Sequence, residues 1–350
     1  MISCVPFVPW ATLVGMRVYC TYFDHRYLPK GLAMIRSLRR KVPEAEIWVL
    51  CLSPEARDIL RSLREPGVHP IALSEFESDD ADLAQAKADG RSDVEYYFTL
   101  TPSLVLHVMR ESPAAEIVTY LDGDLWFLAD PEPVYCEMGD ESILIIPHGF
   151  TAEMKERERY GLYNVGWVSF RADANGKACL EWWRERTIEW CHDRVEDGRF
   201  ADQGYLNQFP VLFKGVHVLA NRGANLAPWN VAASTISIRD NALWANDDRV
   251  LFFHFHELRR LPSGEYLASH GAYKAPLTPL MRDGLYRPYL HELSAIEKEI
   301  AARFTLTESG TLRGIKTRVP IRGWKSLKSR LREARAEAMN RWHGYVIAPD

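Results

Sequence analysis

The sequence of 350 residues has few cysteines, no long apolar run and little net charge, and each absence argues against a class of protein. Its six cysteines include no C-x-x-C pair, which argues against a disulfide scaffold or a zinc module and predicts reduced, mostly buried thiols. No run of about 20 apolar residues occurs, so no transmembrane helix is expected. A net charge of −4 argues against a protein that binds nucleic acid through overall positive charge.

The composition is that of a globular chain, with 47% hydrophobic and 26% charged residues, and this excludes disorder as the main state. We expect an N-terminal extension over 1–16, because the first fifteen residues are apolar but lack the basic start of a signal peptide. Residues 17–260 form one continuous unit, 261–312 a segment that wraps it, and 313–350 a basic C-terminal helix or tail.

The basic tail has ten Lys and Arg between residues 313 and 341 against two Glu, a net +8 that leaves −12 for the rest of the chain. Its apolar residues recur every three or four positions, at Trp324, Leu327, Leu331, Ala334, Ala338 and Trp342. Such a helix suits contact with an anionic membrane through residues 313–343. It suits equally the docking of its apolar side on the main unit. The two interpretations place the protein in the cytoplasm, with or without contact at the inner face of the membrane.

The first part of the unit alternates strands and helices. Strand-like runs cover 17–23, 46–53 and 68–73, and helical periodicity covers 29–40 and 54–65. This β-α-β-α-β order predicts an α/β fold with a doubly wound, mostly parallel, Rossmann-like sheet. Further along, we expect a strand over 163–171 and a helix over 176–194.

The strongest chemical feature follows an apolar strand, 117–121, that ends in Asp122-Gly123-Asp124. In an open α/β sheet, ligands bind at the carboxyl ends of the strands. Two carboxylates one residue apart suit a hard divalent cation, and that cation can neutralise a diphosphate leaving group. Gly123 lets a ligand approach the backbone closely. A bare D-x-D is common in surface loops, so it is this position after a buried strand that favours a metal site.

The segment TYLDGDLWFLADP (119–131) resembles the D-x-D strand of GT-A glycosyltransferases. Over roughly residues 17–260 the chain is most similar to the glycogenin and lipopolysaccharide galactosyltransferase family and its bacterial relatives. The resemblance implies a GT-A fold with a C-terminal helical extension. It also implies Mn²⁺ or Mg²⁺ as cofactor, and a nucleoside diphosphate sugar, most simply a UDP-sugar, as donor.

The first matching motif is CTYFDHRYLPKGLAMIRSL (20–38), the opening strand and helix. By resemblance, Thr21, Tyr22 and Asp24 face the nucleotide, and the ring of Tyr22 or Tyr27 stacks on the base. Each tyrosine fits ordinary packing equally well.

Two further motifs concern the metal and the sugar. By resemblance, Asp124 binds the metal directly, while Asp122 shares the metal or bonds the ribose. In YNVGWVSFR (163–171), Asn164 and Gly166 then line the donor-sugar pocket, where the Asn164 amide offers a donor and an acceptor.

The segment RFADQGYLNQF (199–209) matches the D-Q segment of the family. This implies that Asp202 bonds the sugar hydroxyls and that Gln203 lies near the anomeric carbon. A carboxamide is a poor nucleophile, so the Gln203 carbonyl is expected to stabilise an oxocarbenium-like transition state.

The last motif, FFHFHELRR (252–260), resembles H-x-x-G-x-x-K, which implies His254 as a metal ligand and Arg260 as a phosphate contact. Glu257 stands where the family has Gly, and His256 is a rival ligand because alternate strand residues share a face. The Arg that the family often has near Thr101 is missing, which leaves donor selectivity open.

The prediction is therefore a metal-dependent hexosyltransferase, retaining by resemblance, that transfers a sugar to a saccharide or lipid-linked acceptor, with cell-envelope polysaccharide synthesis as one setting. Trp229 is a candidate wall of the acceptor side. One alternative is a sugar-nucleotide nucleotidyltransferase, although residues 20–31 lack the Gly-rich basic signature of that class. Another is a non-catalytic nucleotide-binding scaffold of the same fold, which Gly123, Glu257 and the missing Arg would suit.

Overall fold

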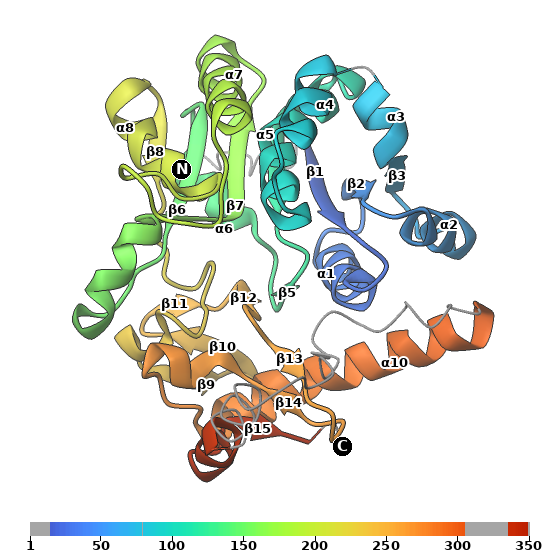
Figure 1. Cartoon of the computed structure of the whole chain (residues 1–350). Coiled ribbons are helices and arrows are strands. Elements are labelled where there is room, and N and C mark those ends of the chain that lie inside the picture. The colour runs from blue at the N-terminus through green and yellow to red at the C-terminus, as the bar shows by residue number, and fades with distance from the viewer. Residues whose placement is uncertain (1–14, 79, 305–334, 349–350) are drawn as a thin grey trace, which may run out of the picture.

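A seven-stranded sheet forms the centre of the computed structural model, which describes residues 15–78, 80–304 and 335–348 (Figure 1). In the first part, three parallel strands alternate with two helices. The elements are β1 (Met16–Phe23), α1 (Leu28–Lys41), β2 (Glu46–Cys51), α2 (Pro54–Leu63) and β3 (Val68–Ala72). The predicted β-α-β-α-β order is thus confirmed.

The second part of the sheet adds an antiparallel strand. β4 (Ala115–Leu121) lies parallel to β1, and β7 (Tyr163–Arg171) lies antiparallel between β4 and β6 (Ile143–Pro147). With β8 (Val216–Val218) at the edge, the order is β3-β2-β1-β4-β7-β6-β8. The predicted fold class, an α/β fold with a mostly parallel, doubly wound sheet, is confirmed.

Two long helices, α5 (Asp93–Glu111) and α7 (Ala174–Glu189), pack against each other beside the sheet (Figure 1). Both begin at side-chain caps, a capping box of Ser92 with Glu95 and an Asp173 side chain that accepts from the backbone of Gly176. The helix predicted over 176–194 ends at Glu189, and a loop follows. Among the described residues up to 250, the other α-helices are short: α3 (Leu73–Ser78), α4 (Ala81–Ala88), α6 (Glu132–Met138) and α8 (Phe209–Leu212).

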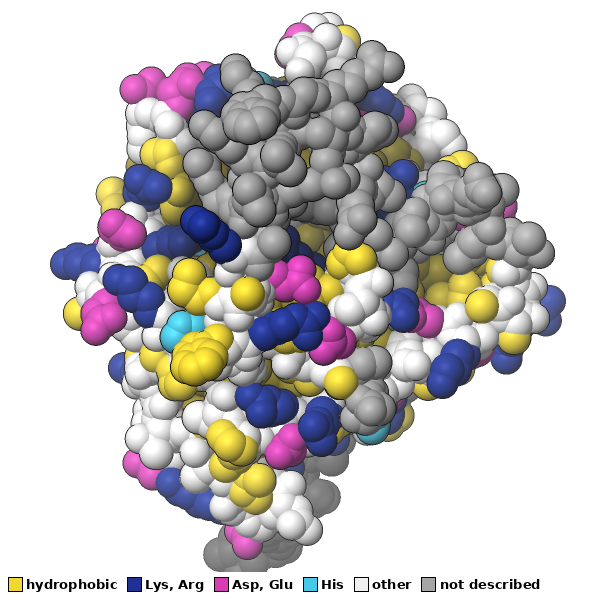
Figure 2. Space-filling model, turned by 60° about the horizontal axis from the view of Figure 1, so that its bottom comes forward, with side chains coloured by type: hydrophobic (Ala, Val, Ile, Leu, Met, Phe, Trp, Pro, Cys, Tyr) yellow, Lys and Arg dark blue, Asp and Glu magenta, His cyan; other side chains and the backbone are white. Residues whose placement is uncertain are grey.

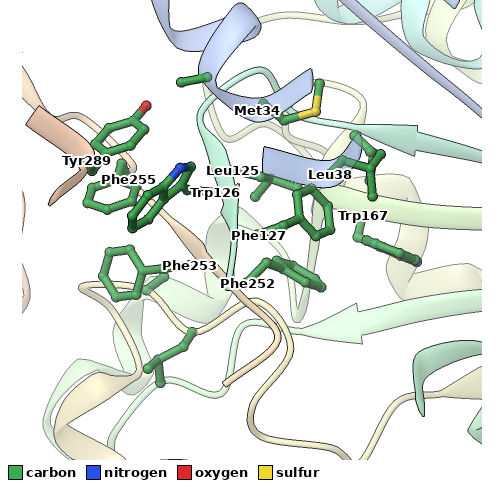
Figure 3. Packing of buried hydrophobic residues seen from close by; sticks show 14 of the residues in the cluster. Met34, Leu38, Leu125, Trp126, Phe127, Trp167, Phe252, Phe253, Phe255 and Tyr289 are labelled. Atoms are coloured by element: carbon green, nitrogen blue, oxygen red, sulfur yellow. The ribbon is translucent and has the colours of Figure 1, made fainter. Parts of the chain in front are cut away.

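A small two-stranded sheet brings distant parts of the chain together. β5 (Leu125–Phe127), directly after the D-x-D segment, pairs antiparallel with β12 (Phe252–His254). Buried aromatic rings hold this pair in place (Figure 3), with Trp167 stacked on Phe252 at 5.1 Å and Phe255 stacked on Tyr289 at 3.7 Å between ring centres. Aromatic burial on this scale dominates core energetics. His254 is therefore delivered next to the aspartates.

The C-terminal part packs below the main sheet in Figure 1. Helix α10 (Arg287–Arg303) lies against α1, and a three-stranded sheet joins β13 (Arg259–Arg260), β14 (Tyr266–Leu267) and β15 (Val346–Ile347). A second small sheet comprises β9 (Ile236–Arg239), β10 (Ala242–Ala245) and β11 (Asp248–Arg249), and α9 (Pro279–Met281) precedes α10.

The predicted terminal segments are only partly described. Residues 1–14 and 313–334, which carry most of the extension and of the basic helix, lie outside the described residues, while 335–342 are helical. None of the described helices is long and apolar enough to cross a bilayer. The five described cysteines are free thiols and all but Cys136 are buried, as predicted.

Candidate functional site

A cavity of about 490 Å³ lies at the carboxyl ends of β1 and β4. Its walls come from both halves of the chain and are rich in aromatic and acidic side chains. The lining includes Tyr22, Asp24, Tyr27, Asp122, Gly123, Asp124, His148, Phe150, Arg157, Asn164, Asp202, Gln203, Trp229, His254, His256, Glu257 and Tyr273. An apolar cavity with a few convergent polar groups is the usual form of a ligand site.

Two carboxylates and an imidazole meet on one wall of the cavity. His254 Nε2 lies 3.0 Å from Asp124 Oδ1 and 3.6 Å from Asp122 Oδ2. Ligand atoms of these three residues lie within 4.8 Å of one another, and the group is the metal-ligand cluster found among the described residues. His256, the rival ligand, is not part of it, although its ring centre is 5.9 Å from that of His254. Two carboxylates and an imidazole suit a divalent cation such as Mn²⁺.

The tautomer of His254 follows from a chain of hydrogen bonds. The Gly166 N–H must donate, so the Asn164 atom that accepts it at 3.0 Å is Oδ1. Asn225 Nδ2 donates to that same oxygen at 3.0 Å, which turns Asn225 Oδ1 toward His254 Nδ1, 3.2 Å away. Nδ1 therefore carries a hydrogen, and Nε2 is the nitrogen that faces the aspartates. A partner on the outer nitrogen is the usual support of a metal-binding histidine.

Tyrosine hydroxyls support both carboxylates. Tyr120 donates to Asp122 Oδ1 at 3.0 Å, and Tyr27 donates to Asp124 Oδ2. Lys30, on the first turn of α1, places its ammonium 4.0 Å from Asp124 Oδ2 and 4.6 Å from the centre of the Tyr27 ring. The Tyr27 hydroxyl is thus engaged with the acidic group, an arrangement that the sequence did not indicate.

Burial and neighbouring charge separate the two aspartates. Burial raises the pKa of Asp122 to about 6, against the opposing effect of His254. Burial acts on Asp124 as well, but His254, Lys30 and Tyr27 together hold its pKa well below the usual range. Burial lowers the pKa of His254, but the two aspartates outweigh it and the net shift is upward. Opposed shifts in adjacent carboxylates are characteristic of functional sites.

The predicted sugar-pocket residues form one hydrogen-bonded unit. Asn164 Nδ2 donates to Gln203 Oε1 at 3.1 Å, and that oxygen also accepts from the Val165 N–H at 3.4 Å. Gln203 Nε2 donates to the backbone oxygen of Tyr160 at 2.9 Å. Both ends of the Gln203 amide are therefore bonded to the protein, and its carbonyl oxygen already accepts two hydrogens.

Asp202 lines the cavity, and as a residue it is only 4% exposed. Burial raises its pKa to about 7, with a smaller contribution from Asp122, while a hydrogen bond from Thr101 opposes the rise. Thr101 thus offers Asp202 a neutral hydrogen-bond partner.

Gly166 is required by the protein itself, which corrects the expectation that it leaves room for the sugar. A Cβ there would lie 2.6 Å from Asn164 Oδ1 and 2.8 Å from the His254 ring, and Gly166 does not line the cavity. At Gly123, by contrast, the nearest atom to such a Cβ is in the Tyr27 ring at 3.4 Å, an ordinary contact. Gly123 therefore keeps open the space above the aspartates.

Two of the predicted nucleotide contacts are placed elsewhere. Thr21 is fully buried and does not line the cavity, because it alternates in β1 with Tyr22, which does. Arg260 is also absent from the lining. Its guanidinium pairs with Glu297 of α10 at 3.2 Å, where β13 joins β14. Asp24 does line the cavity, and its Oδ1 caps the backbone N–H groups of Arg26 and Tyr27.

The chain is similar to two proteins of Bacillus subtilis (strain 168). It is 30% identical to the uncharacterized protein YfnF over 283 residues, covering 79% of this chain and 89% of YfnF. The chain belongs to the family of YfnF. It is also 28% identical to the uncharacterized protein YfnD over 290 residues, covering 82% of this chain and 91% of YfnD. No protein-family model matches the chain.

Solved structures with a similar fold include two glycosyltransferases. The galactosyltransferase LgtC, in complex with donor and acceptor sugar analogues, is 16% identical with a TM-score of 0.47, covering 83% of this chain and 98% of LgtC. Mouse xyloside xylosyltransferase 1 is 14% identical with a TM-score of 0.43, and the match covers 70% of this chain and 98% of the mouse chain.

Proposed function

We propose that this protein is a metal-dependent glycosyltransferase that transfers a sugar from a nucleoside diphosphate, most simply UDP, to a saccharide or lipid-linked acceptor. The observation that carries the proposal is the group of Asp122, Asp124 and His254 at the carboxyl end of β4, inside an aromatic-lined cavity. The sequence resemblance to GT-A glycosyltransferases supports it independently.

The donor set fits a divalent cation, and its imidazole favours Mn²⁺ over Mg²⁺, which prefers oxygen ligands. Asp122 and Asp124 would hold the ion through oxygen and His254 through Nε2. When bound, the ion supplies charge neutralisation for the departing diphosphate. The protein's own contribution is orientation: Tyr120, Tyr27 and Asn225 fix the three ligands, and Lys30 adds positive charge beside Asp124.

Asn164, Asp202 and Gln203 would position the donor sugar. Asp202 reaches the cavity from the segment after α7, and its raised pKa suits a carboxyl that exchanges hydrogen bonds with sugar hydroxyls near neutral pH. Because Gln203 Oε1 already accepts from Asn164 and Val165, we assign Gln203 chiefly to holding Asn164 in place. Retention of the anomeric configuration is proposed from the resemblance alone.

The test measures melting temperature with UDP, with and without Mn²⁺, and the release of UDP from a panel of UDP-sugars. A ligand that binds only the folded state raises the melting temperature. We expect an Mn²⁺-dependent shift and Mn²⁺-dependent release in the wild type, and loss of both in Asp124→Asn. Asp140→Asn, an exposed aspartate, is the matched control.

Other results would identify the alternatives. Binding of UDP without sugar release, with every acceptor class tried, would favour the non-catalytic scaffold. Formation of a UDP-sugar from UTP and a sugar phosphate would identify a nucleotidyltransferase. No binding of any nucleotide would refute the proposal.

Contact with an anionic membrane is a separate proposal. In the described C-terminal helix, Trp342 is 84% exposed and Met339 59%. On this face, however, positive side chains are interspersed with negative ones (Figure 2), and Arg341 is paired with Glu265 and Glu337. Co-sedimentation with vesicles of anionic or neutral lipid tests the contact. Trp342→Ser should weaken binding to anionic vesicles, and unchanged binding would refute the role of this residue.

A further inference from the structure

One guanidinium group, that of Arg157, lines the cavity. Arg157 lies on η1 (Ala152–Tyr160), a 3₁₀ segment that follows β6. Among the described residues that line the cavity, it is the single Lys or Arg, whereas six carboxyl groups line the same space: Asp24, Asp122, Asp124, Asp193, Asp202 and Glu257. These carboxylates would repel an anionic group of a ligand over most of the cavity lining. Such a group would therefore bind beside Arg157.

The guanidinium of Arg157 is held in place but has no ion-pair partner among the described residues. Its Cζ lies 5.0 Å above the centre of the Tyr273 ring, and Nη2 makes one long hydrogen bond, 3.3 Å, to the backbone oxygen of Ala272. Stacking on an aromatic ring orients the planar donor group. The remaining N–H groups are free to bind an oxyanion through two parallel hydrogen bonds.

Two aromatic rings separate Arg157 from the aspartate–histidine group. Trp229 contacts the His254 ring, with ring centres 4.9 Å apart, and Tyr273 contacts Trp229 at 6.2 Å. A diphosphate held at Asp122, Asp124 and His254 would therefore lie against a different wall. On the proposed function, the Tyr273 side of the cavity is left for the acceptor, and aromatic faces suit the C–H groups of sugars.

We propose that Arg157, stacked on Tyr273, binds an oxyanion, carboxylate or phosphate, on a saccharide acceptor. This inference rests on the proposed function, because the acceptor subsite is defined relative to the donor at the metal group. It names a substrate class: acidic sugars or sugar phosphates, in preference to their neutral counterparts.

The experiment uses the full chain saturated with UDP and Mn²⁺, and titrates three sugars followed by saturation-transfer NMR. The probes are methyl glucoside, methyl glucuronide and glucose 6-phosphate. They separate a neutral sugar from one with a carboxylate and one with a phosphate. We expect at least one anionic probe to bind about tenfold or more tightly than the neutral one, because charge-assisted bidentate bonds are the strong ones.

Variants assign the preference to a residue. Arg157→Ala should abolish the preference, and Arg157→Lys should keep part of it. Arg159→Ala is the matched control, because Arg159 lies on the same segment, stacks on Tyr160 at 4.8 Å, and does not line the cavity. UDP binding should be equal in all four proteins.

Several results would overturn the assignment. Equal binding of the three probes, or binding of none of them, would do so, as would an anionic preference that survives Arg157→Ala. Weaker UDP binding in Arg157→Ala would instead make Arg157 a phosphate contact of the donor. If UDP itself fails to bind the wild type with Mn²⁺, the proposed function fails, and this inference with it. Normal UDP binding with no anionic preference refutes this inference alone.

Discussion

Removing the Asn225 side chain should weaken metal binding without removing a ligand. Asn225 is buried and its φ is +57°, so Asn225→Gly keeps a residue that suits this backbone and deletes only the amide. His254 Nδ1 then loses its acceptor, the hydrogen bond that fixes which nitrogen faces the aspartates. Loss of such an outer partner typically costs about 10–100-fold in metal affinity, or about 1.4–2.8 kcal/mol.

The assay is a titration of Mn²⁺ followed by electron paramagnetic resonance, with the melting temperature measured in parallel. A buried, unpaired imidazole N–H also costs about 1–3 kcal/mol of stability, so both quantities should fall. Asn225→Asp keeps an oxygen for His254 but loses the donor to Asn164 Oδ1, so its Mn²⁺ affinity should lie between that of Asn225→Gly and that of the wild type. Asn241→Gly, at the same φ of +57° in the β9–β10 turn, controls for the backbone change. Wild-type affinity in Asn225→Gly would refute the reasoning.

Three further predictions concern stability. Gly166→Ala should lower the free energy of unfolding by about 1–3 kcal/mol and weaken Mn²⁺ binding, because the new methyl group overlaps Asn164 and His254. Gly123→Ala should fold normally, because its methyl group makes only ordinary contacts. Equal melting temperatures of the two variants would contradict this. His270 is buried between Tyr286 Oη (2.9 Å) and the backbone oxygen of Pro276 (3.1 Å), and burial lowers its pKa to about 4. The unfolded chain therefore binds the proton first, so about 3 kcal/mol of stability present above pH about 6.5 is lost as the pH falls toward about 4. Urea unfolding across this range should show a shallower pH dependence in His270→Gln, and an unchanged slope would disprove the assignment. Ile347→Ala should lower the free energy of unfolding by about 2–5 kcal/mol, because Ile347 is 1% exposed where β15 pairs with β14. Denaturant unfolding measures this loss. A smaller loss than in Val346→Ala, at a half-buried position, would count against the docking of β15.

The sequence predicted those parts of the fold that depend on local pattern. The strand over 163–171 has the predicted bounds, and the first three strands and two helices occur in the predicted order. The end of α7 differs because periodicity continues past Glu189, whereas the chain turns there to bring Asp202 to the cavity. Local periodicity does not record such a tertiary requirement.

The candidate site was predictable where a residue sits next to a strand end. Asp122 and Asp124 follow β4 directly, and strand alternation alone shows that Thr21 and Tyr22 face opposite sides. The role of Asn225 was not predictable, because it depends on contacts with two residues far away in sequence, Asn164 and His254. Arg260 was misassigned for the same reason: its partner, Glu297, lies on a helix that the motif does not include.

The pairing of β5 with β12 has a consequence for the order of events during synthesis. Asp122 and Asp124 emerge from the ribosome long before His254, and the stack of Phe255 on Tyr289 needs a still later residue. The amino-terminal half can therefore complete its parallel strands while its acidic group remains without a histidine. All three ligands are present only once His254 has been translated, and the aromatic stack beside them only once Tyr289 has. The site would thus be completed well after its acidic half.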